Sequence, residues 1–366
     1  MTPTSRTVLQ AGFGGFGPTH LQAWLRKGFG RHLWIADPDP SARARAALHL
    51  PAERIVADYR EVLEDADLVD VVAPTEEHVE ICIAAIEAGK DVLVEKPLTL
   101  RVDEAQRLAE IVAASDRILQ VGYYFRHHPL ARYARDRVTR GDLGRLRYLS
   151  GNFYGLKRAR GDIGVTANDA VHFLDLFNWL IGAAPVEVFA VQRDHFGRGL
   201  DDLSVILLTW PDGTLAKIEA SYIQPGRQPD AVMPNALTTK TVEVCGSEGA
   251  LEIDFQAERL IWHRVRHERR DDGLWHPVFG DAIVPKLEPR GAVEVVASQL
   301  TEFLDHVEHR TAPEADVRSC GVAMAVLLDA IALSARTNRP VSCQVGGPAC
   351  PSPTPSVPLP STRSRG

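Results

Sequence analysis

A glycine-rich turn between two apolar segments restricts the fold of this chain more than any other feature. Residues 7–11 (TVLQA) fit a short first strand, and they run directly into the sequence GFGGFG at 12–17. A segment with helical character, 20–25, comes next, and a second apolar run, 33–37, ends in an acidic residue. A strand, a G-x-G-x-x-G turn, a helix, a strand and an acid in this order are typical of a mononucleotide-binding unit.

Each part of this unit has a physical role in holding a dinucleotide. Gly12 permits the tight turn, Gly14 lets the backbone approach a pyrophosphate closely, and Gly17 lets the helix pack against the strand. The helix N-terminus offers free N–H groups to the phosphates. Asp37 lies where a carboxylate accepts hydrogen bonds from the adenosine ribose, and it would repel a 2′-phosphate. The pattern predicts NAD, with NADP less favoured because arginines follow Asp37 closely.

The glycine turn opens a regular alternation of strands and helices. Strands are expected at 67–74, 91–94 and 118–122, and helices at 76–88 and 103–114. This alternation predicts a parallel sheet with right-handed crossovers, whose ligands bind beyond the carboxyl ends of the strands. The cofactor is therefore expected to contact one rim of the sheet, formed by Gly12, Gly14, Phe16, Gly17, Asp37, Pro74, Thr75, His78, Glu95 and Lys96.

Lys96 lies at the end of a predicted strand, between Glu95 and Pro97. Proline biases the residue before it toward an extended conformation, so the lysine side chain has a defined direction. Beside a nicotinamide, a lysine can hydrogen-bond a substrate hydroxyl and stabilise the alkoxide that forms as hydride leaves, and burial can lower its pKa toward a useful range. The simpler interpretation is a solvated Glu–Lys pair in a loop.

The chain resembles the family of NAD(P)-dependent sugar and polyol oxidoreductases named Gfo/Idh/MocA, after glucose–fructose oxidoreductase, inositol dehydrogenase and the rhizopine-catabolism protein. The matching stretches, within residues 7 to about 182, are GFGGFGPTHLQAW, TEEHVEICIAAIEAGKDVLVEKPLTL, VGYYFRHHP, RGDLGRLRY and DAVHFLDLFNWLIG. The EKP stretch with its preceding A-G-K-x-V is the most specific. The resemblance implies a catalytic role for Lys96 and a ribose or nicotinamide contact for Glu95. It also implies an open sheet whose exposed face makes the contacts of a homodimer or homotetramer.

Beyond residue 123 the pattern changes to strands with few intervening helices. Strands are predicted at 147–153, 186–192, 203–210, 214–222, 241–245, 249–254 and 260–265. They favour a large, mostly antiparallel open sheet with one face covered by helices at 169–181, 292–308 and 316–337. The charged run 264–272 is predicted to be a solvated loop. The predicted fold is α/β: a Rossmann domain over 1–123, an α+β substrate-binding and oligomerisation domain over 124–345, and a disordered Pro- and Ser-rich tail over 346–366.

The segment 163–177 is apolar on most sides, yet it carries Asn168, Asp169, His172 and Asp175. Residues three and four apart share a helix face, so the first two flank His172. A histidine is well suited to accept a hydroxyl proton near neutral pH, and a carboxylate one turn away can orient it. Considered alone, a hydrogen-bonded core histidine is the simpler interpretation. Asp175 is expected to be structural.

The resemblance bears on the same helix, because the family pattern places an Asp four residues before this His. Here Asn168 stands at that position, and Asp169 stands three residues before the His. Either the acid has moved by one residue, or an amide positions substrate while Asp169 orients Lys96 or His172. We expect Lys96, Asp169 and His172 to be catalytic. The expected substrate contacts are Tyr124, Arg126, Arg158, Asn168 and His172.

Composition limits the remaining functional classes. The net charge is −7 and no strongly basic patch is visible, which argues against nucleic-acid and anionic-membrane partners. No apolar run suggests a membrane span, and the N-terminus does not resemble a signal peptide. The five scattered cysteines form no C-x-x-C pair, so neither a metal site nor a disulfide framework is predicted, and a reducing cytoplasm is the expected location.

Three functions are compatible with these patterns. The leading one is a dehydrogenase that moves hydride between NAD and a secondary alcohol of a sugar, sugar phosphate, nucleotide sugar or cyclitol, C3 of a hexose being one such position. The second is a family variant that uses bound NAD in a redox-neutral elimination or glycoside cleavage. The third is a non-catalytic NAD-binding regulator, which need not keep both the lysine and the histidine.

Overall fold

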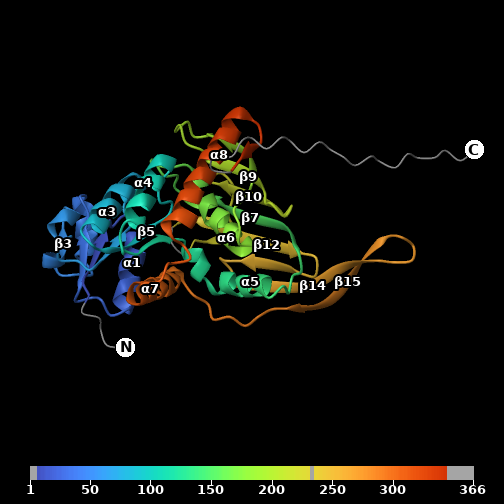
Figure 1. The fold of residues 1–366 in the computed structure, drawn as a ribbon, viewed down its shortest axis with the longest axis horizontal. Coiled ribbons are helices and arrows are strands. Elements are labelled where there is room, and N and C mark those ends of the chain that lie inside the picture. Colours follow the sequence, from blue (N-terminus) through green and yellow to red (C-terminus); the bar gives the residue numbers. More distant parts are fainter. Residues whose placement is uncertain (1–5, 231–234, 344–366) are drawn as a thin grey trace, which may run out of the picture.

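Two β-sheets of different character organise the structure, a computed structural model that describes residues 6–230 and 235–343 (Figure 1). The first sheet has six parallel strands in the order β3-β2-β1-β4-β5-β6. Their bounds are Val8–Ala11 (β1), Leu33–Ala36 (β2), Ile55–Val56 (β3), Leu68–Val71 (β4), Asp91–Glu95 (β5) and Leu119–Gly122 (β6). This sheet confirms the predicted N-terminal fold.

The parallel sheet forms because its central strands are buried along their whole length. Every residue of β1, β4, β5 and β6 is buried, as expected for strands covered by helices on both faces. The helices of this part are Gly17–Arg26 (α1), Pro40–Ala46 (α2), Thr75–Glu87 (α3) and Val102–Ala113 (α4). The carboxyl ends of β1 and β5 bring the glycine turn and Lys96 to the same edge of the sheet.

The second sheet has ten strands, and β15-β14-β13-β12-β7-β10-β9-β8-β16 is the order along its main path, with β11 paired to β12. All of its pairs are antiparallel except β7 with β10. This confirms the predicted mostly antiparallel sheet. The bounds are Leu146–Leu156 (β7), Glu187–Arg193 (β8), Leu203–Thr209 (β9), Leu215–Ser221 (β10), Gln228–Pro229 (β11), Leu237–Gly246 (β12), Ala250–Asp254 (β13), Arg259–Arg269 (β14), Trp275–Ile283 (β15) and Val341–Ser342 (β16).

Helix α6 (Val171–Ile181) lies directly on this sheet. A Cβ added to Gly151 of β7 would lie 2.8 Å from the ring of Phe173 and 3.1 Å from that of Phe177, so the glycine allows α6 to approach. Helix α5 (Pro129–Thr139) contacts α6, and α8 (Ala323–Thr337) packs on β8. The close fit positions the start of α6, which carries the predicted catalytic histidine.

Helix α7 (Ala292–His309) does not cover the antiparallel sheet, so that expectation was wrong. It packs against α1 of the first domain, where Val296, Leu300 and Phe303 share a core with Trp24. The apolar stripe of α7 predicts a buried helix but not the surface that buries it. Part of the predicted 124–345 domain thus completes the core of the first one. The domain boundaries remain a prediction, and the tail at 346–366 lies outside the described residues.

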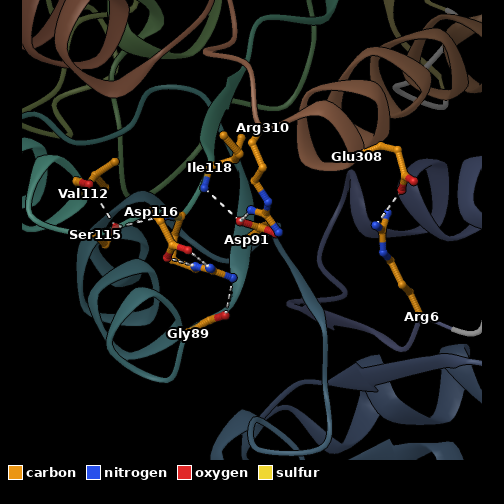
Figure 2. Close-up of polar contacts among 10 residues, drawn as sticks. Arg6, Gly89, Asp91, Val112, Ser115, Asp116, Ile118, Glu308 and Arg310 are labelled. Atoms are coloured by element: carbon orange, nitrogen blue, oxygen red, sulfur yellow. Dashed lines mark hydrogen bonds and ion pairs between the residues drawn. The ribbon is translucent and has the colours of Figure 1, made fainter.

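Ion pairs fasten the end of α7 to the parallel sheet (Figure 2). Arg310, which follows the helix, contacts Asp91 at 2.7 Å, and Glu308 contacts Arg6 at 2.7 Å. Asp91 also accepts a hydrogen bond of 2.9 Å from the backbone N–H of Ile118. Because Asp91 is buried, it joins β5, the start of β6 and the end of α7 in one polar contact.

The charged run 264–272 is mostly strand rather than the predicted loop. Strand β14 continues to Arg269 and pairs with β15, with Arg269 opposite Trp275. The two strands extend away from the rest of the molecule (Figure 1). Most of their side chains near the turn are exposed on both faces, so the hydrophobic alternation that marks a strand is absent there.

One helical stretch, 317–337, is long and apolar enough to cross a membrane by length and composition alone. Half of its most apolar window is buried inside the structure, as in the core helix of a globular domain. It comprises the π-helical turn η5 (Val317–Val322) and α8. The expectation that no apolar run has this length was therefore wrong for this helix.

Candidate active site

The glycine turn has the backbone geometry that a pyrophosphate site requires. Gly12 has a φ of +106°, and a Cβ there would lie 2.6 Å from the backbone after β4. A Cβ at Gly17 would lie 3.1 Å from the carbonyl oxygen of Gly12, a shorter separation than most side chains tolerate. A Cβ at Gly14 would meet nothing within 4 Å. The turn is thus tight where it meets the protein and open where a dinucleotide would lie, so these residues fit NAD.

Asp37 has a second function besides the predicted ribose contact. Its carboxylate accepts hydrogen bonds from the backbone N–H groups of Phe13 at 2.7 Å and Asp39 at 2.9 Å. It thereby ties the end of β2 to the glycine turn. Arg43 and Arg45 donate to backbone carbonyls of the same region, at 2.8 Å to Asp37 and 3.1 Å to Phe13.

The remaining predicted cofactor residues lie at the same rim. Pro74 caps the N-terminus of α3, and Thr75 is its buried first residue. His78 braces the rim instead of facing it, because its two ring nitrogens lie 3.0 Å from the carbonyl of Pro97 and 2.9 Å from that of Ala73. Burial lowers the pKa of His78.

Phe16 and Tyr124 connect the glycine turn to the histidine of α6. The ring of Phe16 lies 5.8 Å from that of Tyr124, and Tyr124 meets the His172 ring edge-on at 5.3 Å. Burial raises the pKa of the Tyr124 hydroxyl, so this residue is neutral. The predicted cofactor and substrate residues therefore meet along one aromatic wall.

Glu95 belongs to a buried chain of charges that the sequence interpretation missed. His20 lies between two carboxylates, with Nδ1 2.8 Å from Asp70 and Nε2 3.2 Å from Glu95. Burial alone would lower the pKa of His20, but the two carboxylates outweigh it and raise the pKa to about 10. An imidazolium can donate to both neighbours. Trp24 donates to the far end of the chain, at 2.7 Å from Asp70.

Lys96 points from the end of β5 toward the start of α6. Its Nζ donates to the backbone carbonyl of Asn168 at 2.9 Å. Burial lowers the pKa of Lys96 to about 8, although Glu95 and Asp169 oppose the shift. A lysine with this pKa is mostly protonated at neutral pH, so it can donate a hydrogen bond to a substrate oxygen, and it loses its proton just above that range. The geometry does not fit the alternative of a solvated loop pair.

Asn168 and Asp169 lie in a π-helical turn, η4 (Thr166–Ala170), that leads into α6. Such turns occur frequently at functional sites. Asp201 holds the start of the turn, accepting hydrogen bonds from the backbone N–H of Thr166 at 2.9 Å and its hydroxyl at 2.6 Å. A Cβ at Gly164 would lie 1.7 Å from the Asp201 carboxylate, so the glycine makes this contact possible.

Asp169 pairs with a lysine other than Lys96. Its carboxylate lies 2.8 Å from Nζ of Lys157, and the side-chain amide of Asn168 donates to it at 2.9 Å. Both charged side chains of the pair are almost fully buried. The sequence left two alternatives for Asn168 and Asp169, and neither describes this arrangement fully. The backbone carbonyl of Asn168 accepts the hydrogen bond of Lys96, while Asp169 orients Lys157.

His172 is buried among aromatic rings. Phe153 stacks on it at 5.7 Å and Phe125 lies 5.1 Å away. Burial first, and then the charges of nearby lysines, hold the pKa of His172 well below its usual range. Its Nδ1 has no hydrogen-bond partner within the described part of the chain. A neutral imidazole with a free nitrogen can accept a proton from a substrate hydroxyl.

Two predicted substrate residues do not join this cluster. Arg126 is buried, and its guanidinium contacts the carboxylate of Asp175 at 2.8 Å and the carbonyl of Glu314 at 3.2 Å. This correction follows from burial: an arginine enclosed by the protein needs a buried carboxylate, and Asp175 provides it one turn beyond His172. Arg158 is exposed in the loop after β7.

Sequence interpretation also missed Lys157, Lys240 and Asp230. Lys240 lies on β12 at an inward position shared with Val242 and Val244, and its Nζ lies 2.9 Å from Asp230. A lysine in phase with buried valines is a detectable signal, because lysines are rarely buried without a partner or a function. Among the described residues, no three metal-binding side chains lie close enough together to hold a metal ion.

Two family models match the chain. Residues 6–123 match the oxidoreductase family with an NAD-binding Rossmann fold, and residues 131–252 match the GFO/IDH/MocA C-terminal domain. UDP-N-acetylglucosamine 3-dehydrogenase of Acidithiobacillus ferrooxidans is 30% identical over 59% of this chain and 68% of its own length. The scyllo-inositol 2-dehydrogenase (NAD+) of Bacillus subtilis is 29% identical over 66% and 72%.

Levoglucosan dehydrogenase of Pseudarthrobacter phenanthrenivorans is 23% identical over 61% of this chain, which spans 64% of that relative's length. Among solved structures, levoglucosan dehydrogenase in complex with NADH and levoglucosan has a TM-score of 0.77 at 22% identity, covering 92% of this chain and 99% of that one. An oxidoreductase domain protein from Kribbella flavida has a TM-score of 0.76 at 24% identity, covering 93% and 100%. These two structures share the fold described above.

Proposed function

Because the chain belongs to the Gfo/Idh/MocA family of NAD-binding oxidoreductases, we propose that it oxidises a secondary hydroxyl of a carbohydrate or cyclitol to the ketone, or catalyses the reverse reaction. The reaction takes place at the Lys96 cluster, which we define as Lys96, Lys157, Asn168, Asp169 and His172. One observation carries the proposal: a lysine of lowered pKa lies at the cofactor edge of the parallel sheet together with a neutral histidine whose Nδ1 has no hydrogen-bond partner among the described residues.

Each residue of the cluster has a separate task. The glycine turn would hold NAD, which would supply the hydride acceptor for the carbinol carbon. His172, a neutral imidazole, accepts the hydroxyl proton. The ammonium group of Lys96 donates a hydrogen bond to the same oxygen and stabilises the negative charge that develops there. Asn168 positions Lys96 through its carbonyl, at 2.9 Å.

The surroundings favour this chemistry by excluding water and fixing directions. His172 is enclosed by Tyr124, Phe125 and Phe153, so an ammonium charge beside it acts more strongly than it would in water. Glu95 is fixed by its contact with His20 at 3.2 Å. Its negative charge raises the pKa of Lys96 and so favours the protonated lysine.

A substrate screen that follows NADH absorbance tests the proposal. The panel contains myo-inositol, scyllo-inositol, D-glucose, levoglucosan, glucose 6-phosphate and UDP-N-acetylglucosamine, each with NAD. We expect at least one compound to give turnover that the H172A variant lacks. Tight NAD binding without NADH formation from any compound would favour the redox-neutral or regulatory alternatives.

We further propose that the protein acts as a homodimer or homotetramer in the cytoplasm. Four leucines of the antiparallel sheet are about half exposed: Leu156, Leu207, Leu215 and Leu237. Single exposed leucines are common on protein surfaces, but several on one sheet suggest a contact surface. A second copy covering this face would bury it. The described cysteines are free thiols, in keeping with a reducing compartment. Light scattering of the purified protein tests the oligomeric state, and a monomer would contradict it.

A further inference from the structure

The buried pair of Lys240 and Asp230 lies beside the Lys96 cluster and has no role in the proposed proton transfer. The two side chains are only 5% and 2% exposed, and Nζ lies 2.9 Å from the carboxylate. Burying two charges costs more than packing two apolar groups of the same size. The inward neighbours on β12, Val242 and Val244, show that this position accommodates apolar side chains. Asp230 also accepts a hydrogen bond of 2.8 Å from the Thr238 hydroxyl, but that contact does not require a buried ammonium group, so the charge of Lys240 points to a further role.

The pair is adjacent to the reacting groups. Nζ of Lys240 lies 5.0 Å from the centre of the Phe153 ring, and Nζ of Lys157 lies 4.8 Å from the same ring, which stacks on His172. After burial, the charge of Asp230 is the main cause that raises the pKa of Tyr124, whose ring meets His172 edge-on at 5.3 Å. The two Lys–Asp pairs, 240 with 230 and 157 with 169, therefore flank the histidine.

Carboxylates balance the cations of this region. Lys157 and Lys240 each have an aspartate, and Lys96 and His20 stand against Glu95 and Asp70. Two arginines near the cluster are also paired, Arg160 with Asp162 at 2.8 Å and Arg126 with Asp175, whereas Arg158 lies exposed in the loop after β7. An added phosphate or carboxylate would be a buried charge without a partner, and such a charge is costly.

A neutral polyol suits such pairs. A hydroxyl group both donates and accepts, so two adjacent hydroxyls can accept from an ammonium and donate to the carboxylate beside it. Hydrogen bonds to charged groups are roughly twice as strong as neutral ones. Neither member of the pair has to change its charge or leave its partner.

We propose that the substrate is a neutral polyol and that Lys240 and Asp230 bind a vicinal diol next to the carbon that is oxidised at the Lys96 cluster. The inference rests on the proposed dehydrogenase function and narrows its substrate class. Phosphorylated sugars, sugar acids and nucleotide sugars are the excluded classes.

Matched substrates test the charge argument. With NAD, the wild-type protein is assayed on myo-inositol against inositol 1-phosphate, and on D-glucose against glucose 6-phosphate, glucuronate and UDP-glucose. We expect kcat/KM to be at least about 10-fold higher for the neutral member of the productive set, since each charged analogue loses its solvation without gaining a partner. A charged member that exceeds its neutral parent would overturn the inference while leaving the dehydrogenase function intact. No turnover in either set would overturn both.

Variants test the pair itself. In K240M and D230N we expect KM for the neutral substrate to rise about 10- to 100-fold, the loss expected for a hydrogen bond to a charged group, while the Kd for NAD stays unchanged. A deoxy analogue that lacks the contacted hydroxyl should show the same KM in K240M as in the wild type. The control K217M removes a half-buried lysine of β10 that pairs with Glu219, and it should leave KM unchanged.

Because one unpaired buried charge destabilises a fold, the double variant K240M/D230L removes both charges and keeps an apolar side chain at each position. We expect it to bind NAD normally and to retain the raised KM. A double variant that binds NAD normally and has the KM of the wild type would show that the pair is structural, and the inference would be wrong.

Discussion

Replacing Lys96 by methionine isolates the ammonium group on which the proposed mechanism depends. Methionine keeps an unbranched side chain in place but loses the donor and the charge beside the substrate oxygen. Removing one donor from an oxyanion site typically lowers kcat by about 10²–10³, or roughly 3–4 kcal/mol of transition-state stabilisation. The Nζ contact runs to Asn168 and not to the glycine turn, so we expect the Kd for NAD to change less than about threefold.

The pH dependence gives the same prediction an independent readout. The pKa of Lys96 lies at about 8, and the residue must be protonated to donate, so kcat/KM of the wild type should fall as pH rises through about 8. His172 stays neutral across this range because its pKa is lowered, so it adds no acid limb near neutrality. K96M should lose activity at all pH values and lose the alkaline limb as well.

The assay is initial-rate NADH formation over pH 6 to about 10, with NAD affinity measured separately by fluorescence. The matched control is K90M, because Lys90 precedes the same strand and its ammonium group donates to the carbonyl of Glu64, at 2.8 Å. K90M should behave as the wild type. A K96M protein that retains more than about a fifth of the wild-type kcat, or a wild-type profile that rises through pH 8, would refute the role given to the lysine.

Three further predictions concern stability and cofactor binding. D175N leaves Arg126 buried without a carboxylate and should lower the free energy of unfolding by roughly 3–5 kcal/mol in denaturant titrations; an unchanged midpoint would contradict the buried pair. G12A should lower both the melting temperature and NAD affinity, because its φ is +106° and its Cβ would meet backbone, whereas G14A should lower NAD affinity alone; equal effects on melting would count against the turn geometry. The pKa of His20 is raised from 6.5 to about 10, so its stabilising effect is fully present below pH 6.5 and is lost as pH rises to about 10. Thermal melts of the wild type should show this decline, those of H20N should not, and parallel curves would refute the buried imidazolium.

Much of the fold is predictable from local patterns. Most of the parallel strands are short apolar runs followed by glycine, proline or an acid. Because these strands are buried on both faces, their apolar sequence can be recognised whichever strands pair with one another. Strand β15 and the outer half of β14 were not predicted. Their side chains are exposed on both faces, so the sequence shows no alternation of apolar and polar residues there. Helix α7 was predicted, but its apolar face could pack on the antiparallel sheet or on another helix. Only the structure shows that its partner is α1.

The site was predictable where one motif holds its residues and unpredictable where distant segments meet. Lys96 follows a strand and His172 lies on an apolar helix, so both stood out. Arg126 was misassigned because sequence does not reveal that Asp175, 49 residues later, neutralises it. Lys240 lies on β12 and Lys157 directly follows β7, and these two strands pair only in three dimensions. Their relation to Asp169 and Asp230 depends on that register and on the π-helical turn.

The most direct test of the central claim is the path of the hydride. The protein is incubated with NAD and either myo-inositol or D-glucose fully deuterated on carbon, and the NADH that forms is examined by mass spectrometry. The mechanism at the Lys96 cluster predicts NADH that carries deuterium in the wild type and very little NADH in the double variant K96M/H172A. NADH formed without deuterium, or labelled NADH at an undiminished rate in the double variant, would contradict it.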